Sequence, residues 1–154
     1  MSHRKSQSKD PRFAEKVRES FSRQGLMRTL GAELTHVGEG TVEIRVKFRD
    51  EFCQEHGYFH GAVTGAIADT TCGYAAYSLT PPKSTVLTVE YKLNLLAPAQ
   101  GEELIARASV IRAGRTLTVC RADVHVARHG KETLCGTLLA TIMVMPASEN
   151  RPEG

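Results

Sequence analysis

A run of small and apolar residues from Gly61 to Leu79 constrains the fold of this chain more than any other feature. The run is long enough for a helix, and it is apolar on nearly every side, which is typical of a helix enclosed by other structure. One carboxylate, Asp69, stands in its middle. A buried carboxylate costs free energy unless it is hydrogen bonded or used. The sequence therefore raises the question of what Asp69 does.

The segments around this run are predicted to form one more helix and six strands. Phe13, Val17 and Phe21 recur at four-residue spacing after Pro11, which predicts a helix that packs by one face. Strict alternation of apolar and polar residues over 41–48 is typical of a half-buried strand. Similar patterns and turn signals place the strands at residues 32–37, 41–48, 84–96, 103–112, 115–128 and 133–145.

Antiparallel strands joined as hairpins, together with one segregated helix, indicate an α+β fold. Because the central helix is apolar all round, we expect a strongly twisted sheet that curls around it. The sequence shows no internal repeat and no second domain. We therefore expect a single domain over residues 11–146, a disordered tail over residues 1–10 and a polar tail over residues 147–154.

Charge and composition narrow the classes of function. The net charge is +3, with 20 basic and 17 acidic residues, which is too small to indicate nucleic-acid binding. No apolar run is long enough to span a bilayer, and no apolar segment follows the basic N-terminus as in a signal peptide. The four cysteines are scattered, without a CxxC pair, so reduced thiols and a cytoplasmic location are expected.

His60 and Gly61 stand where a polar loop becomes the central helix. The first backbone N–H groups of a helix have no internal partner, and with the helix dipole they favour a developing negative charge. Gly61 has no side chain to obstruct a ligand. Two interpretations stay open: an oxyanion hole that polarises a carbonyl group, or an ordinary helix start capped by His60.

Asp69 follows His60 by nine residues, which is roughly 13 Å along one helix at ~1.5 Å per residue. The two residues therefore cannot serve one small reacting centre within the same chain. If both act in a reaction, the helix start of one subunit must face Asp69 of another, in a dimer with two equivalent sites. Small residues that would allow two such helices to pack closely are Gly65, Ala66, Ala68, Gly73 and Ala75. The alternative is a structural carboxylate bonded to its neighbours.

Gln54, His60-Gly61, Asp69 and Thr88 together resemble the active-site pattern of hotdog-fold acyl-CoA thioesterases, and of the phenylacetate-degradation type in particular. The resemblance extends over about residues 31–145. It includes Leu-Ala-Pro-Ala at 96–99 and Ala-Gly-Arg-Thr at 113–116. It implies a sheet wrapped around the long helix, and subunits that join their sheets edge to edge as a homodimer, or as a homotetramer of two dimers.

The same resemblance implies a role for each residue of the pattern. Asp69 would act as general base or nucleophile, and the Gly61 N–H of the other subunit would bind the thioester oxygen. His60 would orient the local site. Gln54 would hold the water or the thioester oxygen, and Thr88 would bond the carboxylate or the water.

Basic residues at hairpin turns are candidates for the phosphates of coenzyme A. The resemblance favours Arg112 and Arg115, which flank one turn, over Arg128 and Lys131, which flank the next. Each is as readily explained as a solvated hairpin charge. Aromatic residues that would line an acyl pocket, or belong to the core, are Phe59, Tyr74 and Tyr77.

Two departures from the family pattern bear on the substrate. The commoner pattern pairs Asn with Asp, whereas Gln usually accompanies Glu in a related branch; this chain combines Gln54 with Asp69. The acyl group therefore stays open, with aromatic and medium-chain groups as candidates. Ala62 replaces a second glycine, a change that retains the Gly61 N–H.

We thus expect an enzyme that hydrolyses acyl-CoA to a carboxylic acid and free coenzyme A without a cofactor. The spacing of Cys53, His56 and His60 lacks a fourth ligand, so no metal is expected. Two alternatives stay open. One is a non-catalytic acyl-CoA-binding hotdog protein, and the other is a thioesterase acting on acyl carrier protein.

Overall fold

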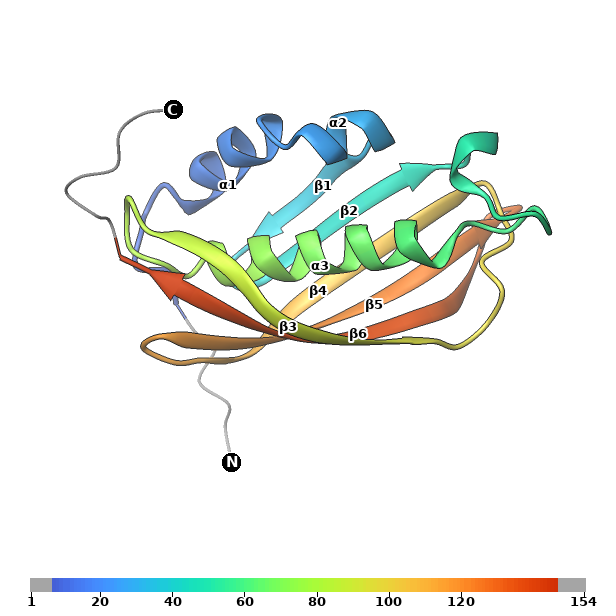
Figure 1. The fold of residues 1–154 in the computed structure, drawn as a ribbon. Helices are drawn as coiled ribbons and strands as arrows, with labels where there is room; N and C mark the ends of the chain where they lie inside the picture. The colour runs from blue at the N-terminus through green and yellow to red at the C-terminus, as the bar shows by residue number, and fades with distance from the viewer. Residues whose placement is uncertain (1–6, 147–154) are drawn as a thin grey trace.

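The computed structural model of the chain describes residues 7–146, in which one antiparallel sheet holds a long helix on its concave face (Figure 1). The strands are β1 (Glu33–Gly38), β2 (Thr41–Lys47), β3 (Thr85–Leu95), β4 (Glu103–Ala113), β5 (Leu117–Arg128) and β6 (Lys131–Met145). They are ordered β1-β2-β4-β5-β6-β3 across the sheet. The helices are α1 (Phe13–Ser22), α2 (Gly25–Leu30), the short 3-10 helix η1 (Asp50–Phe52) and α3 (Gly61–Tyr77).

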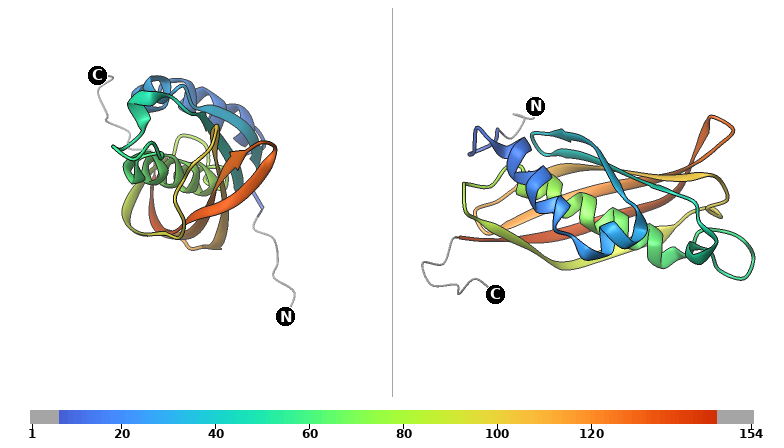
Figure 2. Two further views of the ribbon diagram at one scale, coloured as in Figure 1. Left: turned by 90° about the vertical axis from the view of Figure 1, so that its right-hand side faces the viewer. Right: turned by 90° about the horizontal axis from the view of Figure 1, so that it is seen from above.

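The sheet curls around α3, as the end-on view in Figure 2 shows. Helix α3 contacts strands β2 to β6, while α1 lies across its other side. The predicted α+β architecture, a curled antiparallel sheet around one long helix, is therefore confirmed. No helix among residues 7–146 is both long and apolar enough to cross a membrane.

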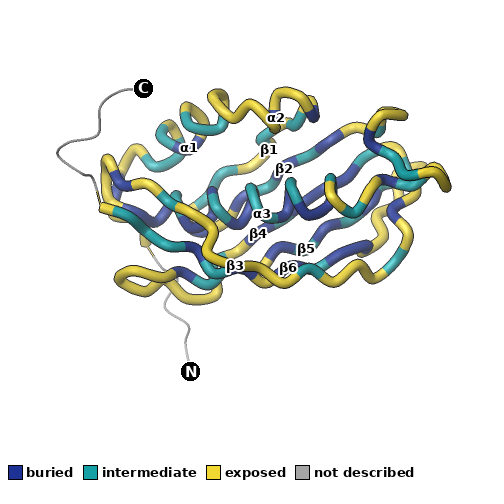
Figure 3. Tube along the Cα trace, in the orientation of Figure 1, coloured by how far each residue is buried: buried dark blue, intermediate teal, exposed yellow. Residues whose placement is uncertain are grey.

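Alternation along the strands builds the core between the sheet and α3. In β2, Val42, Ile44 and Val46 are buried against the helix, whereas Glu43 and Arg45 lie on the outer face. Strand β5 repeats this period of two, whereas β4 and β6 follow it apart from a run of consecutive buried residues in each. Burial is consequently concentrated along the middle of the sheet, and the edge strand β3 is largely exposed (Figure 3).

The C-terminal end of α3 is fixed by Ser78. Its hydroxyl donates to the Ala75 carbonyl at 2.7 Å and accepts the Gly40 N–H at 2.7 Å. The helix therefore ends at Tyr77, before the apolar run itself ends at Leu79. This contact ties the end of α3 to the turn between β1 and β2.

Residues 7–10, which the sequence assigned to a tail, contact the end of α3. The Ser8 hydroxyl donates to the Ser78 carbonyl at 2.6 Å. The buried Asp10 pairs with Lys16 at 3.3 Å, and Lys16 Nζ donates to the Thr80 carbonyl at 3.0 Å. The rest of the two expected tails, residues 1–6 and 147–154, lies outside the described residues.

Some local features differ from the sequence prediction. Strand β5 begins at Leu117 rather than at residue 115. Strand β6 begins at Lys131 rather than at residue 133, because His129 and Gly130 alone form the turn, with φ values of 49° and 77°. Positive φ at both central residues is the requirement of a tight two-residue hairpin. The short helix α2 was not predicted; it ends at Leu30, and the following Gly31 caps it with a left-handed φ of 63°.

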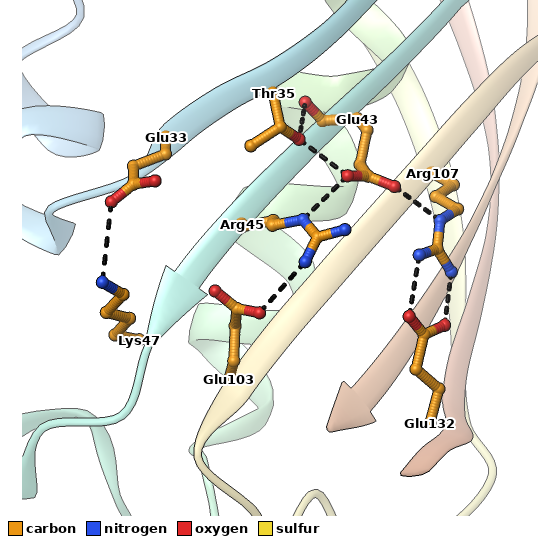
Figure 4. Close-up of polar contacts among 8 residues, drawn as sticks. All are labelled: Glu33, Thr35, Glu43, Arg45, Lys47, Glu103, Arg107 and Glu132. Carbon is orange, nitrogen blue, oxygen red and sulfur yellow. Dashed lines mark hydrogen bonds and ion pairs between the residues drawn. The ribbon is translucent and has the colours of Figure 1, made fainter. Parts of the chain in front are cut away.

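A charged network crosses the outer face of the sheet (Figure 4). Glu43 accepts hydrogen bonds from Thr35 at 2.7 Å, Arg45 at 2.8 Å and Arg107 at 2.6 Å. Arg107 also binds Glu132 through two hydrogen bonds of 2.6 and 2.9 Å. Burial alone would raise the pKa of Glu43, but the three hydrogen bonds outweigh it and bring the pKa to about 2. The network links β1, β2, β4 and β6.

Candidate active site

The start of α3 presents a free backbone donor. The His60 N–H donates to the Phe52 carbonyl at 2.7 Å, and His60 Nδ1 accepts the Ala62 N–H at 2.9 Å. No hydrogen bond among residues 7–146 uses the Gly61 N–H. His60 thus caps the helix and leaves the first helical N–H available to a ligand.

A cavity of about 410 Å³ opens beside this donor, and we call it the helix-start cavity. Gln54 and Gly61 both line it. The Gln54 side-chain oxygen accepts the His56 N–H, so its amide NH₂ is the group left to donate. The structure therefore brings together two of the residues singled out in the sequence, both as N–H donors.

Asp69 and Thr88 meet in a different cavity, of about 650 Å³, which we call the mid-helix cavity. Thr88 Oγ1, from β3, donates to Asp69 Oδ1 at 2.6 Å. The second carboxylate oxygen is not engaged by any hydrogen bond among the described residues. Asp69 is half-buried, so its free oxygen can reach a water or a substrate.

The two cavities share no lining residue. Gly61 and Asp69 are eight residues apart on one straight helix, which is about 12 Å at 1.5 Å per residue. One chain thus holds two separate groups of candidate residues, a pair of donors at the helix start and a positioned carboxylate farther along.

Apolar surface borders the mid-helix cavity on an uncovered flank of α3. On that flank Ala66, Thr70 and Gly73 are only half-buried, so the helix is not enclosed on every side as its composition suggested. The adjacent strand β3 is an edge of the sheet. Its exposed large apolar side chains are Leu87, Val89, Tyr91 and Leu95.

The aromatic candidates divide between the two cavities. Phe59 lines the helix-start cavity and packs edge-on against Phe48, with ring centroids 5.1 Å apart. Tyr74 and Tyr77 line the mid-helix cavity. The four-residue period of the segment that forms α1 predicted packing by one face, but not what that face packs against. The sequence analysis therefore missed four residues of the α1–α2 segment that line the mid-helix cavity: Ser20, Arg23, Gln24 and Leu26.

The expected phosphate ligands line neither the helix-start cavity nor the mid-helix cavity. Arg112 lies near the end of β4 and Arg115 in the turn that follows, and this β4–β5 turn is at the end of the molecule opposite the start of α3 (Figure 1). Arg115 lines a cavity there with Lys9 and Thr80. These arginines could contact a ligand at Gly61 only from a second chain.

Thiol and metal chemistry find little support among residues 7–146. Burial raises the pKa of Cys135, which borders the helix-start cavity, to about 11. A hydrogen bond with Cys120, together with burial, raises the pKa of Cys72. A thiol needs a lowered pKa to serve as a nucleophile. No group of three or more His, Cys, Asp or Glu side chains in this part of the chain could hold a metal ion.

Comparison with known proteins places this architecture in one family. Residues 56–133 match the model of the thioesterase superfamily. A thioesterase family protein from Silicibacter pomeroyi has a crystal structure with 42% identity and a TM-score of 0.86, covering 88% of this chain and 99% of its own. The 1,4-dihydroxy-2-naphthoyl-CoA hydrolase of Listeria monocytogenes is 26% identical over 111 residues, 72% of this chain and 89% of its own.

A further solved structure, of a phenylacetic acid degradation-related protein from Ralstonia eutropha, has 26% identity and a TM-score of 0.73. The match covers 85% of this chain and 98% of that one. Similarity to these proteins therefore extends over the sheet and the central helix together.

Proposed function

Because this chain belongs to the thioesterase superfamily and is a thioester hydrolase, we propose that its substrates are acyl-CoA thioesters, cleaved to a carboxylic acid and free coenzyme A. The observation that carries the proposal is the two groups of candidate residues, each of which we interpret as a half-site. One offers the unpartnered Gly61 N–H beside the Gln54 amide, and the other offers a carboxylate held by Thr88. Thioester hydrolysis needs both kinds of group, oxyanion donors and a base or nucleophile.

Two chains together would complete each active site. The separation of about 12 Å between the half-sites on one helix supports this arrangement, since a single thioester carbon cannot reach both. The exposed apolar edge strand β3 supports it as well, because unpaired edges favour association with another strand. Two-fold symmetry would then give two equivalent sites per homodimer.

In the proposed reaction, the thioester oxygen accepts hydrogen bonds from the Gly61 N–H and the Gln54 amide of one subunit. Asp69 of the other subunit removes a proton from a water whose oxygen forms a bond with the carbonyl carbon. The C–S bond then breaks, and the departing coenzyme A thiolate takes up the proton. Thr88 orients Asp69, and His60 holds the helix start in place.

A nucleophilic route differs in its first bond. There the free Asp69 oxygen attacks the carbonyl carbon and expels the thiolate, and water hydrolyses the resulting anhydride. Label in Asp69 after a single turnover in ¹⁸O-labelled water would establish this route, because only hydrolysis of the anhydride at the aspartyl carbon places it there.

The acyl group would occupy the mid-helix cavity. Tyr74 and Tyr77 give this cavity an aromatic wall beside Asp69, and Leu26 adds an aliphatic side chain. An aromatic or medium-chain acyl group fits such a lining, since aromatic rings pack favourably edge to face. The aromatic substrate in the name of the Listeria relative and the phenylacetic acid in that of the Ralstonia protein support an aryl group, and with it the phenylacetate-degradation type.

Release of thiol from a panel of acyl-CoAs tests this function. Asp69→Asn keeps the side-chain shape and the Thr88 contact but removes the base, so we expect turnover to fall at least a thousandfold for every acyl-CoA. The oligomeric state and the melting temperature of the variant are the controls for folding. Full activity of Asp69→Asn would exclude the proposed mechanism, whereas no turnover of any acyl-CoA by the unaltered enzyme would exclude the substrate class.

A further inference from the structure

The turn between β5 and β6 is at the same end of the molecule as the start of α3 (Figure 1). A cavity of about 600 Å³, which we call the hairpin cavity, lies at this turn. The turn between β5 and β6 forms one side of it, with Arg128, His129 and Lys131. Tyr58 and Pro98 line both this cavity and the helix-start cavity. A ligand that begins at Gly61 can therefore continue past these two residues onto the hairpin.

The hairpin carries two cations without an anionic partner. Arg128 Nη1 donates only to the neutral Gln100 side chain, at 3.2 Å, and no carboxylate lies within 4.0 Å of Arg128 or Lys131 among residues 7–146. His129 differs, because its ring lies 3.5 Å from Glu102 and its N–H donates to the same carboxylate at 3.0 Å. The charges on Arg128 and Lys131 are thus free to bind an anion.

The backbone holds these two cations directly opposite one another. Arg128 and Lys131 are cross-strand partners in the β5–β6 register, joined by the tight His129-Gly130 turn. Like charges in directly opposite positions repel and destabilise a hairpin. An anion between them would remove the repulsion, and an arginine with a lysine is a pairing that suits phosphate oxygens.

We infer that Arg128 and Lys131 bind the phosphate groups of coenzyme A, with the pantetheine arm passing Tyr58 and Pro98 to the helix-start cavity. The inference rests on the proposed function, because it assigns the thiol side of the same substrate. It places the phosphates on the chain that supplies Gly61. Arg112 and Arg115, at the opposite end of that chain, would be required only if a second chain carried the phosphates.

The kinetics of two substrates that differ only in their phosphates test this assignment. Arg128→Ala/Lys131→Ala should raise KM for acyl-CoA at least tenfold, since two charge-assisted contacts are lost, and change kcat less than twofold. For the acyl-pantetheine thioester, which has no phosphate, KM should not change. The control is Arg12→Ala/Arg18→Ala, which removes two exposed cations that line neither the helix-start cavity nor the hairpin cavity and should leave both KM values within twofold.

Three results would overturn the inference. The first is an unchanged KM for acyl-CoA, and the second is an equal rise for acyl-pantetheine. The third is a rise in KM for acyl-CoA that Arg112→Ala/Arg115→Ala produces and Arg128→Ala/Lys131→Ala does not. Calorimetry of free coenzyme A and of pantetheine with the same variants measures the contribution of the phosphates to affinity independently of turnover. A failure of thioester hydrolysis is thereby distinguishable from a failure of phosphate binding.

Discussion

At the scale of single residues, Gly61 satisfies two requirements at once. Its N–H is free for a ligand, and a side chain at this position would place Cβ only 2.8 Å from Leu95 Cδ1. Leu95 is exposed and its Cδ1 is the far end of a flexible side chain, so Gly61→Ala should displace it and lower the free energy of unfolding by less than about 1 kcal/mol. Denaturant unfolding measures this loss, and adding Leu95→Ala should recover part of it. A larger loss would mean that Leu95 cannot move aside.

The Gly61 N–H can be removed without disturbing the helix. Proline is favoured at the first helical position, and His60 already has the extended backbone, with φ −64° and ψ 137°, that a following proline requires. We compare Gly61→Pro/Leu95→Ala with Gly61→Ala/Leu95→Ala, since both have room for a side chain and only the first lacks the N–H. If this N–H stabilises the oxyanion, kcat of Gly61→Pro/Leu95→Ala should be lower than that of Gly61→Ala/Leu95→Ala by a factor of about 10²–10³. Equal kcat values for the two would assign Gly61 a packing role only.

At the scale of elements, the sequence predicted the helices and strands that are determined locally, by alternation of apolar and polar residues or by a continuous apolar run. The strict period of two in residues 41–48 located β2, and the continuous apolar run located α3. Helix α2 has only six residues, too few to show a helical period, so it was missed. The exposed flank of α3 was also not predictable, because small residues are compatible with burial and with exposure alike.

Glu43 makes the stability of the outer-face network, and of the four strands that it links, depend on pH. Its folded pKa of about 2 lies below its ordinary value of 4.5, so the carboxylate stabilises the fold fully above about pH 5, and this stabilisation is lost as pH falls towards 2. For a shift of this size, Glu43→Gln should lower the free energy of unfolding by about 3 kcal/mol at pH 7 and by much less at pH 2.5. Urea unfolding of both proteins at the two pH values measures the difference. A difference independent of pH would mean that Glu43 contributes through packing alone.

At the scale of the whole molecule, the distance between His60 and Asp69 along one helix led to the prediction that each active site draws on two chains. Nothing local in the sequence could place the hairpin cavity beside the start of α3, because the two are some 70 residues apart in the chain and meet only through the sheet order. The family resemblance favoured the turn of Arg112 and Arg115, whereas the cavity that adjoins the helix-start cavity is lined by Arg128 and Lys131. Contacts between remote segments, rather than residue types, decide such choices.

Complementation between two inactive variants tests whether the site is shared. In a heterodimer of Asp69→Asn with Gly61→Pro/Leu95→Ala, one site combines the intact Gly61 of the first chain with the intact Asp69 of the second, and the other site has neither. Each homodimer lacks one essential group in both sites. Random pairing of equal amounts gives half heterodimers, and hence about a quarter of the active sites of the unaltered enzyme.

Co-refolding the two variants and measuring thiol release from an acyl-CoA gives the result, with each variant refolded alone as the control. Recovery to about a quarter of the unaltered activity is expected if each site draws on two chains. Purification through two different affinity tags should then enrich the heterodimer and raise recovery to about a half, one active site of two. Activity no higher than the mean of the two variants would mean that each chain builds its site alone, and α3 would have to bend to bring Asp69 to Gly61.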